Sequence, residues 1–196
     1  METTTKFKVI LASTSPRRRE LLSIICPDFD VCSPNIDERR LTNENPDVLA
    51  KRLARLKAEA VYKANPDAIV LGYDTVVALG NEVFGKPGTI DKAVYCLKAL
   101  NGRTHQVHTG ICVCSPEGEQ SLVVRTDVEF GEFSENILET YARTCEGLDK
   151  AGAYAIQGKG SFLICRINGS YTSVVGLPLY ESALALSKYG IKVFTR

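Results

Sequence analysis

Hydrophobic and polar positions along the chain follow two periods, one typical of strands and one typical of helices. Apolar or alternating runs predict strands at residues 7–12, 68–79, 82–84, 105–114 and 121–131. Apolar residues three or four positions apart predict helices at residues 16–25 and 46–64, within TIDKAVYCLKALNG, from Ser134 and from near Pro178. Because strands and helices alternate along the chain, the pattern predicts an α/β fold with a mixed sheet.

The connections between these elements are less clearly marked. Residues 29–36 fit either a strand or a loop, and the turn SPEGEQ separates the two long alternating segments. Residues 161–167 and 170–175 resemble a hairpin around Asn168-Gly169. The sequence has no repeat, low-complexity segment or long linker, so we expect a single domain over residues 1–196.

The charge balance narrows the class of partner. The chain has 24 basic and 23 acidic residues and a net charge of +1, so we expect no broad attraction to nucleic acid or to a membrane surface. The chain has no apolar run of about 18 residues, so we expect no transmembrane helix. The N-terminal stretch METTTKFKVILAS lacks the apolar core of a secretory signal. We therefore expect a cytoplasmic protein.

Cysteine usage agrees with that compartment. The seven cysteines are odd in number and include no CxxC pair, so we expect reduced thiols. Cys112 and Cys114 alternate within an apolar run, which predicts that they share one face of a strand.

The stretch KVILASTSPRRREL places cations where they are locally unfavourable. A serine before a proline predicts a helix that starts at Pro16. The helix dipole makes this end positive, yet Arg17, Arg18 and Arg19 follow at once. A bound anion would supply the missing negative charge, and we expect Arg19 to face solvent.

Lys57 has an unusual position on the helix predicted at residues 46–64. It lies about 100° from Leu56, inside an arc of apolar and small residues. One interpretation is a lysine at the edge of the buried face, with its charge reaching water. The alternative is a cation that points into a cleft.

Asp74 and Thr75 interrupt the apolar run AIVLGYDTVVALG. A buried carboxylate must be paired, hydrogen-bonded or bound to a metal. Asp74 is therefore either structural or a general base or metal ligand. In FGKPG, Lys86 lies between Gly85 and Pro87, in what is either a simple turn or a phosphate-binding position.

Two further segments carry candidate polar groups. Asp37-Glu38 precedes two arginines and fits either a solvated turn or a source of metal ligands. Gln157, in DKAGAYAIQGKG, has a donor and an acceptor that suit a planar base. Together the candidates provide cations, hydroxyls and hard oxygen ligands suited to Mg²⁺ and a polyphosphate: Arg17, Arg18, Lys57, Lys86, Ser13, Ser15, Asp37, Glu38 and Asp74.

Several other site classes lack their motifs. GKPGT is not a Walker A loop, which disfavours a P-loop NTPase. His105 and His108 are the only histidines, and a strand would place them on opposite faces, which disfavours a zinc site. Gly-x-Ser-x-Gly is absent, so a serine hydrolase elbow has no support.

The sequence resembles the Maf family of nucleoside triphosphate pyrophosphatases. The matching segments occur in order from residue 11 to residue 179: LASTSPRRREL, LKAEAV, GYDTVV, FGKP, HQVHTG, DKAGAYAIQG and INGSYTSVVGLPL. The resemblance implies an elongated α/β fold, similar to inosine triphosphate pyrophosphatases, with two lobes and a central cleft. It also implies Mg²⁺- or Mn²⁺-dependent cleavage of a nucleoside triphosphate to the monophosphate and pyrophosphate, and a homodimer.

The resemblance also implies roles for individual residues. It assigns Asp74, Lys57 and Lys86 to catalysis, with Asp37, Glu38 and Asp74 as the acidic metal site. It assigns substrate binding to the family's serine, arginine, threonine and glutamine positions, here Ser13, Ser15, Arg17, Arg18, Thr75 and Gln157.

The family contains subgroups with different substrates. Arg18, Thr75 and Gln157 match the subgroup that prefers dTTP and UTP. The alternatives are a pyrophosphatase directed at purines (ITP, XTP or 7-methyl-GTP) and a non-enzymatic regulator of cell division. Tyr73, Ala155 and Asp37 depart from residues that are frequent in the family, which leaves fine specificity and metal geometry open.

Overall fold

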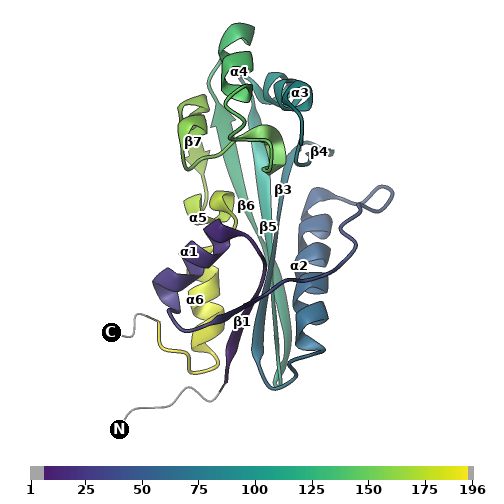
Figure 1. The fold of residues 1–196 in the computed structure, drawn as a ribbon, viewed down its shortest axis with the longest axis vertical. Coiled ribbons are helices and arrows are strands. Elements are labelled where there is room, and N and C mark those ends of the chain that lie inside the picture. Colours follow the sequence, from purple (N-terminus) through teal and green to yellow (C-terminus); the bar gives the residue numbers. More distant parts are fainter. Residues whose placement is uncertain (1–6, 194–196) are drawn as a thin grey trace.

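A mixed sheet forms the centre of the computed structural model, which describes residues 7–193 (Figure 1). Its strands are β1 (Val9–Ala12), β2 (Asp30–Cys32), β3 (Ile69–Leu79), β4 (Glu82–Phe84), β5 (Thr104–Ser115), β6 (Gly118–Phe130) and β7 (Ile164–Asn168). The order is β2-β1-β3-β5-β6-β7, with β4 also paired to β3. β1 is parallel to β2 and β3, and the other pairs are antiparallel. The predicted α/β chain with a mixed sheet is confirmed.

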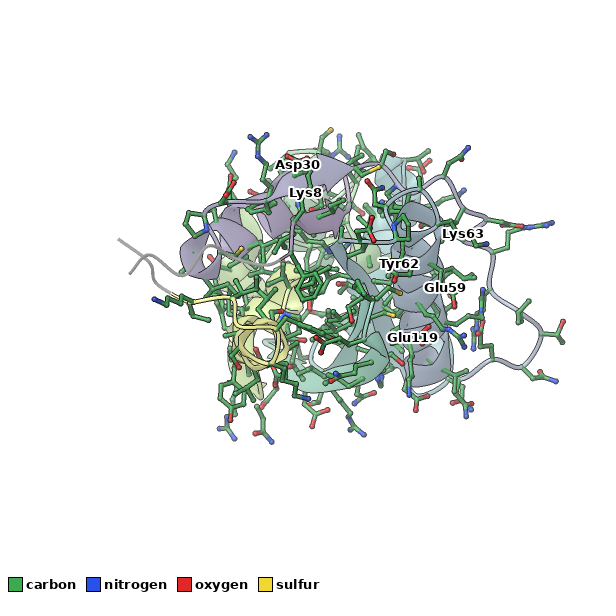
Figure 2. All side chains as sticks on the ribbon, turned by 90° about the horizontal axis from the view of Figure 1, so that it is seen from below. Lys8, Asp30, Glu59, Tyr62, Lys63 and Glu119 are labelled. Atoms are coloured by element: carbon green, nitrogen blue, oxygen red, sulfur yellow. The ribbon has the colours of Figure 1, made fainter. Side chains whose placement is uncertain are left out.

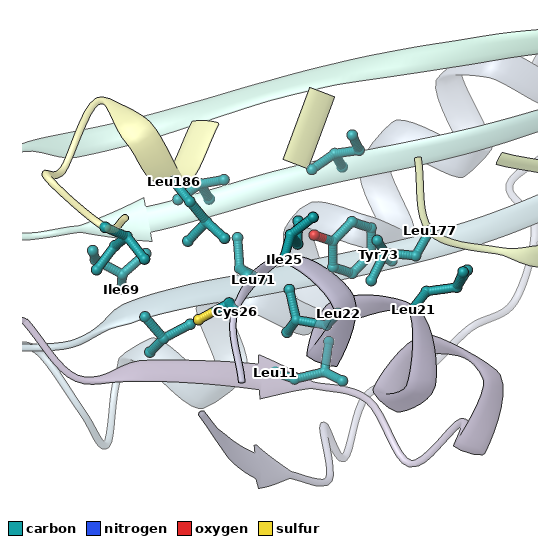
Figure 3. Close-up of a cluster of buried hydrophobic side chains, with 14 of the residues drawn as sticks. Leu11, Leu21, Leu22, Ile25, Cys26, Ile69, Leu71, Tyr73, Leu177 and Leu186 are labelled. Atoms are coloured by element: carbon teal, nitrogen blue, oxygen red, sulfur yellow. The ribbon is translucent and has the colours of Figure 1, made fainter. Parts of the chain in front are cut away.

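Helices cover both faces of the sheet in the half that contains the termini. α1 (Pro16–Ile25), α5 (Tyr171–Val175) and α6 (Leu179–Ser187) cover one face, and α2 (Pro46–Tyr62) covers the other (Figure 1). The alternation of side chains along β3 explains both contacts. Leu71 and Tyr73 pack with Leu22 and Leu177 on the α1 side (Figure 3), whereas Val70 packs beneath α2.

The other half of the sheet has a separate core. Here α3 (Ile90–Leu100), α4 (Glu135–Ala142) and the short 3-10 helices η1 (Ala151–Ala153) and η2 (Lys159–Leu163) cover the strands. Leu97, Val128 and Leu163 are buried in this second cluster. The chain is elongated along β3, β5 and β6, which pass through both halves (Figure 1). We call the two halves, each with its own core, the terminal lobe and the distal lobe.

One predicted connection is wrong. Residues 161–175 do not form a hairpin: β7 pairs with β6, and the segment that follows it is helix α5. The Ser170 side chain caps this helix by accepting a hydrogen bond from the backbone N–H of Ser173, at 3.2 Å. A serine after Asn168-Gly169 can therefore start a helix as readily as a strand, because its oxygen can satisfy a free N–H at the helix start.

The cysteines lie as the strand pattern predicted. All seven cysteines are free thiols, and Cys112 and Cys114 share a face of β5, with 3.9 Å between their sulfurs. No helix described within residues 7–193 is both long and apolar enough to cross a membrane.

Candidate active site

A gap along one edge of β3 creates the main cavity of the described chain. β1 pairs with this edge up to Gly72, and β4 pairs with it from Val77 onward. Residues 73–76 therefore have no partner on this edge among the described strands, while β5 pairs with the opposite edge throughout. A cavity of about 610 Å³ opens here between the terminal and distal lobes. Because side chains alternate, Asp74 and Thr75 leave β3 on opposite faces.

The start of α1 forms one wall of the cavity. Ser15 caps the helix, and its Oγ accepts a hydrogen bond from the backbone N–H of Arg18 at 3.5 Å. The Ser13 hydroxyl oxygen accepts one from the backbone N–H of Ser15 at 3.2 Å. The predicted helix start is confirmed, and Arg19 is exposed as expected.

The first two arginines of α1 differ in how they are held. Arg17 lines the cavity, and no hydrogen bond or ion pair to another described residue holds its guanidinium. Arg18 instead donates to the Gly176 carbonyl at 2.8 Å, to Ser13 Oγ at 3.3 Å and to Thr75 Oγ1 at 3.2 Å. Arg17 is therefore free to contact an anion, whereas Arg18 is fixed against the wall.

Lys57 joins two carboxylates on the α2 side of the cavity. Its Nζ lies 2.6 Å from Asp74 Oδ1 and 2.9 Å from Glu38 Oε1. Lys57 and Asp74 are 6% and 7% exposed, so their charges lie close together away from bulk water. Of the two interpretations of Lys57, the geometry is that of a cation pointing into a cleft.

The pKa values of Asp74 and Glu38 are shifted in opposite directions from their usual values. Burial raises the pKa of Asp74, although the positive charges of Lys57 and Arg18 act against this. Burial would also raise the pKa of Glu38, but the hydrogen bond and charge of Lys57 outweigh it, so that pKa is lowered. A carboxylate with a raised pKa is the stronger base, which singles out Asp74 as the candidate proton acceptor.

Close packing of α2 on the sheet brings Lys57 to this position. A Cβ added at Gly72 would collide with the carbonyl oxygen of Ala54, and one at Gly110 with that of Ala50. Gly110 lies directly opposite Asp74 in the β3–β5 register. The two glycines therefore let the helix backbone approach β3, which carries Asp74, and its neighbour β5.

Lys86 and Gln157 line the cavity from the distal side. Both are exposed, and neither side chain makes a hydrogen bond or ion pair within residues 7–193. Their polar groups are thus available to a ligand, whereas those of Lys57 and Arg18 already have protein partners.

The adjacent acidic residues Asp37 and Glu38 point to different places. Asp37 does not line the cavity: it binds Arg39, with Oδ2 2.8 Å from Nε, and this hydrogen bond lowers the pKa of Asp37. Glu38 and Asp74 converge on Lys57, and their hard oxygen donors suit a divalent cation such as Mg²⁺. The donor set therefore fits a metal with Glu38 and Asp74, but leaves Asp37 apart.

Sequence patterns did not identify several residues that shape the site. Asp149 and Lys150 line the cavity, and Thr109 and Gly176 hold Thr75 and Arg18 in place. Proximity to Gln157 could have indicated the first two. Thr109 and Gly176 have no comparable signal, because their role depends on contacts between distant segments.

Comparisons with known proteins relate the chain to one family. The family model described as Maf-like protein matches residues 8–189. A dTTP/UTP pyrophosphatase of Myxococcus xanthus is 47% identical over 183 residues, which are 93% of this chain and 93% of that protein. One of Deinococcus radiodurans is 47% identical over 188 residues, 95% of each chain. A solved structure of the Staphylococcus aureus Ham1 protein is 19% identical, with a TM-score of 0.46 over 63% of this chain and 71% of that one.

Proposed function

The chain belongs to the Maf family, and from this membership we propose that it is a pyrophosphatase that hydrolyses dTTP and UTP. Water and the nucleoside triphosphate give the nucleoside monophosphate and pyrophosphate. The observation that supports the reaction most strongly is the position of Lys57. It holds Glu38 and Asp74 together in a cavity that also contains the unpaired cations Arg17 and Lys86.

The proposed chemistry begins with the buried carboxylate. Asp74 accepts a proton from water, whose oxygen attacks the α-phosphorus, and the bond to the bridging oxygen of pyrophosphate breaks. Lys57 keeps Asp74 in position and limits the repulsion between Asp74 and Glu38. Mg²⁺ or Mn²⁺, held by Glu38 and Asp74, would neutralise phosphate charge when bound.

A bound triphosphate would explain why arginines follow the start of α1. Arg17 and Lys86 bind oxygens of the departing pyrophosphate, and the positive end of the helix adds to their effect. The triphosphate thereby supplies the negative charge that this helix start lacks. Ser13 and Ser15 shape the same wall.

Recognition of the base is proposed for three other residues that line the cavity. Gln157 has a free amide, and Arg18 and Thr75 form a hydrogen-bonded pair. An amide offers a donor and an acceptor, which complement the alternating edge of uracil or thymine. We propose that these three residues favour pyrimidines, and that the protein acts as a cytoplasmic homodimer that clears nucleotides.

The test is a substrate panel. Pyrophosphate release is measured from dTTP, UTP, CTP, ITP, GTP and 7-methyl-GTP with Mg²⁺ and with Mn²⁺, and the nucleotide product is identified. Selective conversion of dTTP and UTP is expected, with a loss of about 100-fold or more in Asp74→Asn. Selective purine turnover would overturn the specificity, and no turnover by folded protein would favour a regulatory role. Size-exclusion chromatography with light scattering tests the homodimer.

A further inference from the structure

A second group of metal-ligating side chains lies outside the cavity, in the terminal lobe. Cys112 and Cys114 on β5 and Glu119 on β6 each place one ligand atom within 4.8 Å of the others. Figure 2 shows Glu119 beside Glu59 and Tyr62 of α2 at this end of the molecule. We call Cys112, Cys114 and Glu119 the thiol cluster. No residue of this cluster lines the cavity.

The strand register creates the cluster. Cys112 and Cys114 are two residues apart on β5, so both side chains point to the α2 face of the sheet. Glu119 is the direct cross-strand partner of Cys114, and residues paired in this way project to the same face. Two thiols and a carboxylate therefore converge without any loop to hold them.

The spacing of the sulfurs fits one kind of metal. The two Sγ atoms are 3.9 Å apart. Tetrahedral Zn²⁺ with Zn–S bonds of about 2.3 Å needs sulfurs about 3.8 Å apart. A disulfide fits less well, because Cα atoms two residues apart on a strand lie about 6.6–6.8 Å apart, at the far limit for such a bond.

The surroundings also suit a cation. Cys112 and Cys114 are 0% and 4% exposed, among Ala58, Val61 and other apolar side chains. Glu119, the cross-strand partner of Cys114, brings a carboxylate to the two thiols, and a dication would balance its charge together with that of a metal-bound thiolate.

Charged groups on α2 limit access to the cluster. Arg55 binds Glu59, at 2.7 Å, and Glu119, at 3.1 Å. This arginine must release Glu119 when the carboxylate binds a metal, and Glu59 remains as its partner. Water can take the fourth coordination position, as in open zinc sites.

We propose that Cys112, Cys114 and Glu119 form a binding site for a thiophilic divalent cation of the Zn²⁺ class. Thiolate ligands select such ions over Mg²⁺, so this site is chemically distinct from Glu38 and Asp74 in the cavity. The inference does not depend on the proposed hydrolysis, because none of its ligands takes part in that reaction.

The test uses Co²⁺ as a spectroscopic probe and Zn²⁺ as competitor. The full chain carries Cys145→Ser and Cys165→Ser, because these two thiols are exposed and could bind metal adventitiously. A near-ultraviolet thiolate-to-cobalt charge-transfer band is expected at one Co²⁺ per chain, and Zn²⁺ should abolish it. Cobalt bound only by carboxylates in the cavity gives no such band, so the two sites are distinguished.

Three variants locate the band. Cys112→Ser and Cys114→Ser should each remove most of its intensity, whereas Cys96→Ser, a buried thiol of the distal lobe, should leave it unchanged. Glu119→Gln changes an exposed side chain and should fold normally. It should keep a thiolate band but weaken Co²⁺ and Zn²⁺ binding at least about tenfold, since even outer partners of a metal contribute that much.

Two results would overturn the proposal. The first is the absence of a charge-transfer band in folded protein with reduced thiols. The second is a band whose intensity and affinity are unchanged in Cys114→Ser and Glu119→Gln, which would place the metal on other cysteines. Circular dichroism of each variant confirms that a lost band reflects lost ligands and not unfolding.

Discussion

The hydroxyl of Thr109 fixes the direction of the hydrogen bond between Thr109 and Thr75. Thr109 Oγ1 donates its single proton to the carbonyl of Ser173 at 2.8 Å. In the 3.1 Å contact between the two threonines, Thr75 must therefore be the donor. The remaining lone pairs of Thr75 accept from Arg18, at 3.2 Å. One buried threonine thus determines which polar group Thr75 presents beside the cavity.

Thr109→Val tests this arrangement, because it removes the acceptor of Thr75 and keeps the side-chain volume. We expect KM for dTTP and UTP to rise about 3- to 10-fold, the value of one neutral hydrogen bond, with kcat little changed. Thr109→Ser keeps the hydroxyl and should restore KM. Steady-state kinetics of both variants, beside Thr75→Val, provide the measurement. If Thr75→Val is impaired while Thr109→Val matches the parent, Thr109 does not position Thr75.

Substitutions at the contact between Lys57 and Asp74 allow effects on catalysis to be separated from effects on stability. Lys57→Met leaves Asp74 buried without its nearest cation, and breaking such a pair costs about 3–5 kcal/mol of unfolding free energy. Protonation of Asp74 can reduce this cost, because its pKa is already raised. We expect kcat to fall about 100-fold or more.

The double variant Lys57→Met with Asp74→Asn is the matched control. It removes both charges, so urea unfolding should show stability restored toward that of the parent, while activity remains lost. A double variant that recovers activity together with stability would contradict the catalytic roles. That outcome would make the ion pair a structural feature of the cavity wall.

The sequence is informative wherever a residue's position depends on its own element. Helical periodicity placed Lys57 inside the small-residue arc of α2, and the interrupted apolar run marked Asp74 as a buried carboxylate. The helix predicted at 16–25 agrees with α1, because Ser15 and Pro16 are local signals of a helix start. These features need only the periods of helices and strands.

Contacts between distant segments are not encoded in this way. Arg18 donates to Gly176, which is 158 positions away, and no pattern near either residue indicates the pair. The divergence of Asp37 and Glu38 likewise depends on their loop. There the carboxylate of the buried Glu44 binds Arg52 at 2.6 Å, and Arg52 also donates to the carbonyl of Arg39, next to Glu38, at 3.0 Å. Tertiary packing, not local preference, decides which carboxylate enters the cavity.

Gly110→Ala should disturb the position of α2. The added Cβ would collide with the carbonyl of Ala50, so the helix that carries Lys57 must move away from Asp74. Overpacking of this kind costs about 1–3 kcal/mol. We expect a lower urea midpoint together with a reduced kcat. Gly85→Ala is the control for stability, because a Cβ there meets nothing within 4 Å. Equal midpoints for the two variants would show that α2 tolerates the extra methyl group.

Buried His105 should make stability depend on pH. Its Nε2 lies 2.8 Å from the Tyr154 hydroxyl, and burial lowers its pKa from 6.5 to about 4. The unfolded chain takes up a proton near pH 6.5, whereas the folded chain does so only near pH 4. This contribution is therefore constant above pH 6.5 and decreases as pH falls toward 4, by up to about 3 kcal/mol.

His105→Phe removes this titration and keeps an aromatic ring against Phe130. The variant should be less stable at neutral pH, because the Tyr154 hydroxyl loses its partner, yet its stability should decline less between pH 6.5 and 4. Urea unfolding across this range compares the two slopes. His108→Gln is the comparison: burial lowers the pKa of His108 in the same direction but less strongly, so this variant should keep more of the parent slope than His105→Phe does. A His105→Phe slope equal to that of the parent would show that other groups, not His105, govern the acid sensitivity.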